Sequence, residues 1–169
     1  MHDLLNDFAS ETHLGAWVIL LRLVGAAALC GVIGLERETR HRPAGLRTHM
    51  MVGLASALYC LIMLETLADA GEFSDRVAMD PIRLIEAVTS GVAFLAAGMI
   101  VFAQGKVHGL TTGAALWLCA AIGLAVGFGM WVMAGMTTAL ALIVIRIIKS
   151  MENRMKRDED APAAEDRGD

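Results

Sequence analysis

Five long apolar stretches, separated by short polar or glycine-containing links, most constrain what this chain can fold into. A helix needs about 20 residues to cross the roughly 30 Å of hydrocarbon in a bilayer. Soluble helices carry polar stripes, which most of these stretches lack, and the chain as a whole is 56% hydrophobic. We therefore predict an all-α membrane protein. Its five transmembrane helices are expected at residues 14–35, 50–68, 81–102, 109–127 and 130–148.

The links between these stretches contain residues that start or end helices. Asp80 followed by Pro81 predicts an N-cap with proline at the first helical position. The segment 127–129 holds two glycines, and the segment 104–106 holds one. Because the links are short, we expect consecutive helices to pack antiparallel in one bundle.

The Lys and Arg residues predict the orientation of the bundle. They gather in the 36–49 loop, the 103–108 link and the C-terminal end: Arg37, Arg40, Arg42, Arg47, Lys106, Arg146, Lys149, Arg154, Lys156, Arg157 and Arg167. The opposite side holds only Arg76. Because basic loops stay in the cytoplasm, an N-out, C-in topology follows. Residues 1–13 are then a periplasmic N-terminus and 14–149 the transmembrane domain. Residues 150–169 form a cytoplasmic tail, largely disordered because its end is acidic and rich in small residues.

Four charged residues fall in the outer half of the predicted bundle: Arg22, Glu65, Arg83 and Glu86. Charges inside a membrane are costly, and they usually pair with one another or line a polar cavity. Two interpretations stay open. The group is either a site for an ion or polar ligand open to the outside, or a structural cluster of ion pairs.

A second charged group lies at the predicted inner end, where the first two helices meet: Glu36, Arg37, Glu38, Arg47, Thr48 and His49. Its two halves are expected to face each other across a short hairpin. The group can serve as a salt-bridge network and topology signal, or it can hold anionic lipid head groups at about 1 kcal/mol per charge. The histidines are dispersed, so we expect no metal site and no cofactor.

Small residues recur along the helices and predict close helix packing without a large hydrophobic drive. The glycines of interest are Gly31, Gly34, Gly91, Gly98, Gly123 and Gly127. They can pack helices within one small-residue-packed bundle or form a face for a homo-oligomer, and the sequence leaves both open.

Several ordered motifs together resemble the MgtC/SapB family of bacterial membrane proteins. They are Arg22 with the segments 34–38 and 44–49, then Asp80, Pro81 and Arg83, then the segment 91–98, and finally the segments 109–112 and 114–124. The resemblance covers about residues 15–150. The sequence departs from the family at Ala93 and Ala96, where glycine is usual, and at Ala87, where a polar residue is common.

The resemblance implies a multi-pass protein of the bacterial inner membrane without established catalytic chemistry. Members are linked to growth in low magnesium and to survival inside host cells. Some regulate other membrane proteins by contact, including the proton-driven ATP synthase, and direct magnesium transport has also been suggested.

Three function classes follow, in order of preference. The first is a regulator that acts through contacts with other membrane proteins in adaptation to low magnesium or related stress. The alternative is a cation (Mg²⁺) transporter or channel that uses the outer charged group. An enzyme is not expected, because the sequence has no nucleophile–base pairing, phosphate loop or metal-ligand spacing. The bilayer is the expected surrounding, and no nucleic-acid partner is expected.

Overall fold

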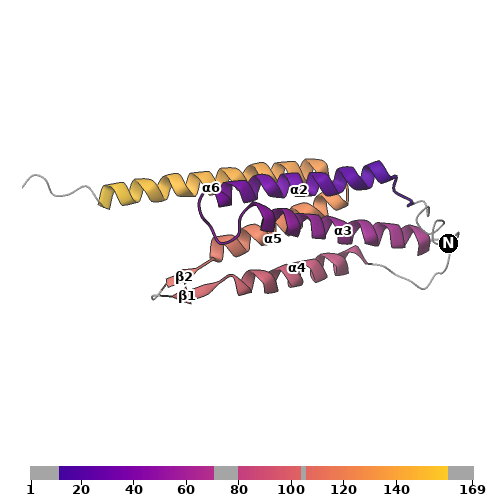
Figure 1. Cartoon of the computed structure of the whole chain (residues 1–169), viewed down its shortest axis with the longest axis horizontal. Helices are drawn as coiled ribbons and strands as arrows, with labels where there is room; N and C mark the ends of the chain where they lie inside the picture. Colours follow the sequence, from indigo (N-terminus) through magenta and orange to yellow (C-terminus); the bar gives the residue numbers. More distant parts are fainter. Residues whose placement is uncertain (1–11, 71–79, 104–105, 160–169) are drawn as a thin grey trace, which may run out of the picture.

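The computed structural model describes residues 12–70, 80–103 and 106–159. In these ranges the chain forms five helices: α2 (Ala16–Glu38), α3 (Leu46–Ala70), α4 (Pro81–Gly98), α5 (Leu110–Gly127) and α6 (Trp131–Glu159). Two short strands, β1 (Val101–Ala103) and β2 (Lys106–His108), join α4 to α5. The helices lie lengthwise beside one another, and α6 extends past the others at the end where the strands lie (Figure 1).

Helix α5 is the centre of the bundle, because it contacts α2, α3, α4 and α6. Most of its side chains are buried, including Leu116, Cys119 and Ile122. Cys30 of α2 packs into the same core, and its thiol donates to the Cys119 carbonyl at 3.4 Å. The buried residues of α5 also include small ones, such as Ala120 and Gly123, which allow the surrounding helices to approach closely.

The expected class is confirmed: the chain is a mostly helical, multi-pass membrane protein. Helices α2, α4 and α5, with Leu46–Ala68 of α3, are long and apolar enough to cross a membrane. In α6 the apolar stretch is shorter, Trp131–Ile147. The N-out, C-in orientation stays a prediction. The chain reverses direction at each link, so the α2–α3 turn, the strands and the far end of α6 lie at one end of the bundle (Figure 1).

The third helix begins as predicted and ends earlier. Asp80 caps α4, since its Oδ1 accepts a hydrogen bond of 2.9 Å from the Ile82 amide. The predicted end at residue 102 is wrong, because α4 ends at Gly98 and β1 pairs antiparallel with β2. After the hairpin the chain turns into α5 at Gly109, whose φ of 89° is in the left-handed region that favours glycine.

The end of the last helix also differs from the prediction. Helix α6 continues to Glu159, so the expected disordered tail is corrected for residues 150–159, which are helical. Residues 160–169 lie outside the described ranges, as do 71–79 and most of the predicted N-terminal segment 1–13.

Candidate functional site

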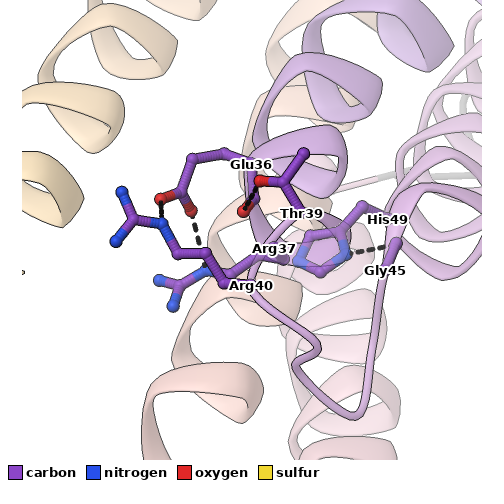
Figure 2. Close-up of polar contacts among 6 residues, drawn as sticks. All are labelled: Glu36, Arg37, Thr39, Arg40, Gly45 and His49. Atoms are coloured by element: carbon purple, nitrogen blue, oxygen red, sulfur yellow. Dashed lines mark hydrogen bonds and ion pairs between the residues drawn. The ribbon is translucent and has the colours of Figure 1, made fainter.

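The inner charged group includes an ion pair at the end of α2. Glu36 pairs with Arg40 one helical turn later, and its Oε2 lies 3.9 Å from Nε of Arg37. Figure 2 shows the two guanidinium groups extending to the same side of α2, away from His49. The Thr39 hydroxyl donates to the Glu36 carbonyl at 2.8 Å, which ties the end of the helix to the turn that follows.

Glu38 connects α2 to the start of α3. Its Oε2 accepts a hydrogen bond of 2.7 Å from the amide of Leu46, the first residue of α3. The first amides of a helix have no partner within the helix, so a carboxylate placed there stabilises it. A Cβ at Gly45 would lie 2.7 Å from the same oxygen. Glycine at position 45 therefore leaves room for this cap.

His49 is fully buried at the crossing of α2 and α3. Its Nδ1 lies 2.7 Å from the Gly45 carbonyl, which can only accept, so Nδ1 carries the proton. Its Nε2 is buried and has no hydrogen-bond partner in the described part of the chain. The helices meet here because Gly34 has no side chain: a Cβ at Gly34 would lie 2.8 Å from Cα of Leu46 and 2.9 Å from Cβ of His49.

Of the six predicted inner residues, Glu36 and Arg37 lie next to each other. Glu38 and His49 instead form hydrogen bonds with backbone groups at the start of α3 and just before it. Arg47 is exposed, and Thr48 lines a groove between α3 and α4. Glu36 pairs with Arg37 of α2 and with Arg40 of the turn after it, and not with Arg47. The predicted inner group omits Arg40, although its spacing of four residues from Glu36 signals a helical pair.

A cavity of about 280 Å³ lies between α2, α5 and α6 at this end. Arg37, Arg40 and Arg42 form its charged wall. Apolar side chains of α5 and α6, among them Leu118 and Val144, line the rest. We call this cavity the arginine pocket.

Two members of the outer charged group, Arg22 and Glu65, form hydrogen bonds with backbone groups. Arg22 Nη1 donates at 2.7 Å to the carbonyl of Gly127, the last residue of α5. Glu65 accepts hydrogen bonds from the amides of His13 at 2.7 Å and Leu14 at 2.8 Å, just before α2 begins. Both side chains therefore satisfy backbone groups at helix ends.

Arg83 and Glu86 are exposed on α4. Among the described residues, no ion pair joins any two of Arg22, Glu65, Arg83 and Glu86. A ligand site formed by these four residues stays a prediction. Within residues 12–70, 80–103 and 106–159, no three His, Cys, Asp or Glu side chains come together as metal ligands.

The predicted packing glycines fall into two groups. Gly34, Gly123 and Gly127 lie where a Cβ would meet backbone or Cβ atoms of a neighbouring helix, and Gly31 lies against the Met50 side chain. Gly91 and Gly98, both on α4, have nothing within 4 Å of the position that a Cβ would take. The first group packs the bundle, and the second lies open on its surface.

The sequence comparison identifies the family. The family model described as "MgtC family" matches residues 23–154, which include α2 through α6 apart from their ends. The chain belongs to the MgtC family. This confirms the resemblance seen in the motifs, and the inner-end residues from Glu36 to His49 lie within the match.

Relatives support the same assignment. The chain is 38% identical over 136 residues to "Putative magnesium transporter YhiD" of Escherichia coli K12, covering 80% of this chain and 63% of YhiD. It is 39% identical over 134 residues to "Protein SapB" of Bacillus subtilis, covering 77% of this chain and 56% of SapB. It is 37% identical over 132 residues to "Protein MgtC" of Brucella abortus strain 2308, covering 76% of this chain and 50% of that protein. The chain thus spans less than two thirds of the length of these relatives. No solved structure gives a significant match.

Proposed function

We propose that this protein is a regulator in the bacterial inner membrane that acts in adaptation to low magnesium by contacting another membrane protein, without catalysis. The observation that carries the proposal is an open apolar groove of about 660 Å³ between α3 and α4. Its walls include Val52, Tyr59, Leu84, Gly91 and Leu95. A groove of this kind on a membrane protein suits a helix of a partner.

The packing of α4 supports this use of the groove. Only Val88 and Ala96 of α4 are buried, and the helix packs mainly on α5. Gly91 faces open space and lines the groove. Small residues on an open helix face let a second helix approach closely. The α4 side of the bundle is therefore the expected contact surface.

The interior of the bundle offers little to a passing ion, which also favours a regulator. The buried hydroxyls of Ser56 and Thr138 donate to carbonyls one turn earlier in their own helices, at 2.9 Å and 2.8 Å. Arg22 and Glu65 are engaged by backbone groups. These polar groups stabilise the bundle itself, so they are not free to replace the hydration shell of an ion.

Growth in low magnesium tests the proposal. A bacterial strain without its MgtC-family protein would carry this chain or the variant Gly91→Leu, which fills the groove. Gly135→Leu is the matched control, because Gly135 of α6 also has nothing within 4 Å of a Cβ. We expect Gly91→Leu to lose growth support at normal membrane levels and Gly135→Leu to keep it. Equal growth of the two variants would contradict the use of this face.

The partner to test first is the proton-driven ATP synthase, because members of the family are linked to it. Co-purification of the synthase with the chain, but not with Gly91→Leu, is the expected result. Recovery of only a second copy of this chain would instead assign the groove to a homo-oligomer.

The second candidate function is a Mg²⁺ transporter, favoured by the name of the relative YhiD. It predicts Mg²⁺ flux into liposomes that contain the purified protein. Arg22→Ala or Glu86→Ala should then alter the flux. Absence of flux of any common cation would eliminate this candidate, and it would leave the growth experiment as the test of the regulator.

A further inference from the structure

The arginine pocket has a polar wall and an apolar body. Arg37, Arg40 and Arg42 come from the end of α2 and the turn after it, and Thr111 comes from the first turn of α5. The rest of the lining is apolar, including Ala114, Leu118, Ala141 and Ile145. A ligand that fits both parts must itself be amphipathic.

The charge of the pocket is positive. Its wall holds three arginines, and the acidic side chain among them is Glu36, which pairs with Arg40. Arg42 is exposed at the mouth. The basic groups therefore outnumber the acid, and an anion is the complementary ligand.

Arg37 is a buried arginine that lines the pocket. Its side chain lines the cavity, the residue is only 8% exposed, and its Nε is buried without a hydrogen bond in the described residues. The nearest acidic oxygen, on Glu36, is 3.9 Å away, beyond hydrogen-bond distance. Buried polar groups in proteins are nearly always hydrogen-bonded. Arg37 lines the pocket, so its positive charge also favours an anion there.

We infer that the arginine pocket binds the phosphate head group of an anionic phospholipid. Arg37, Arg40 and Arg42 hold the phosphate, and the acyl chains begin against Ala114, Leu118 and Val144. The cavity of about 280 Å³ is slightly smaller than the roughly 300–1,000 Å³ of typical ligand sites. It accommodates a head group and the first part of a chain, and the remainder lies along the outer surface of the bundle.

The place of the pocket fits a lipid better than a free phosphate. The pocket lies between helices at the end of the bundle that the basic residues predict to be cytoplasmic, and basic pockets at that depth bind anionic lipid head groups. Free phosphate would use only the arginine wall and would leave the apolar body without an occupant.

Lipid-dependent thermal stability of the purified protein in detergent tests the inference. Dioleoyl phosphatidylglycerol and dioleoyl phosphatidylcholine would be titrated separately, and the lipid concentration at the half-maximal shift in Tm would be recorded. We expect phosphatidylglycerol to stabilise the protein at lower concentrations. Arg42→Gln should raise the phosphatidylglycerol concentration at the half-maximal shift about fivefold, which is the effect of one basic group near a lipid surface. Ala114→Leu fills the apolar part of the pocket without changing its charge, and it should raise this concentration as well.

Arg47→Gln is the matched control, because Arg47 is also exposed at this end of the bundle and does not line the pocket. It should leave the titration unchanged. Equal responses to the two lipids would overturn the inference, and so would equal losses in Arg42→Gln and Arg47→Gln. If Ala114→Leu has no effect and millimolar inorganic phosphate displaces the lipid, the pocket is a free-phosphate site and the inference is also overturned.

Discussion

At the scale of single residues, Gly34 sets how closely α2 and α3 can approach. Gly34→Ala would place a Cβ 2.8 Å from Cα of Leu46 and 3.0 Å from the Gly45 carbonyl oxygen, both backbone atoms that cannot rotate away. We expect the free energy of unfolding to fall by about 1–3 kcal/mol, as for other overpacked sites. This free energy can be measured by unfolding the protein in mixed micelles that contain increasing amounts of dodecyl sulfate. Gly135→Ala, at an open position of α6, should not destabilise the protein.

Glu38 gives a second prediction at this scale. Its carboxylate accepts from the Leu46 amide, so Glu38→Ala leaves the first turn of α3 without this cap. The free energy of unfolding should fall by about 0.5–2 kcal/mol, as for the loss of other helix caps. Hydrogen exchange at the Leu46 amide should also accelerate. Glu86→Ala, an exposed site on α4, is the control; a loss as large there would contradict the capping role.

At the scale of elements, Arg22 ties α2 to the end of α5. It donates to the Gly127 carbonyl, one of the last carbonyls of α5, where a cation is favourable. Arg22→Leu should lower the free energy of unfolding by about 1.5–3 kcal/mol, the range for hydrogen bonds to charged groups. Arg83→Leu, at an exposed site on α4, should have a small effect in the same unfolding assay. Similar losses in both variants would contradict this role of Arg22.

The helices were predictable where local patterns decide them. The Asp80–Pro81 start of α4 and the breaks before α5 and α6 follow from cap and glycine chemistry. Hydropathy does not predict the end of α4, because the apolar residues 101–103 suit a helix as well as a strand. Their pairing with residues 106–108 decides the outcome. Helix α3 begins at Leu46, before the apolar stretch, because Glu38 caps it from another element.

The candidate sites were predictable only in part for a similar reason. Sequence spacing places Arg22 and Glu65 at a common depth, but it does not show that each has a backbone partner far along the chain. Likewise, the sequence marks the arginines at the end of α2 as a group. That their guanidinium groups face α5 and α6, which form a pocket with them, depends on tertiary packing.

At the scale of the whole molecule, the charge distribution predicts an N-out, C-in bundle. Alkaline phosphatase inserted after Ser74 should be active, since that link is predicted to be periplasmic. Green fluorescent protein fused to the C-terminus should fluoresce, since that end is predicted to be cytoplasmic. The reverse pattern would contradict the orientation, and it would also move the arginine pocket to the periplasmic side.

We propose that the groove between α3 and α4 contacts another membrane protein. Site-specific photocrosslinking can detect this contact, with p-benzoylphenylalanine replacing Tyr59, an exposed aromatic residue in the groove. Trp117, an exposed aromatic residue outside the groove, is the control position. We predict one discrete crosslink to a different membrane protein from position 59, none from position 117, and its loss in Gly91→Leu. Crosslinks only to lipid or to a second copy of this chain would contradict a contact with another membrane protein.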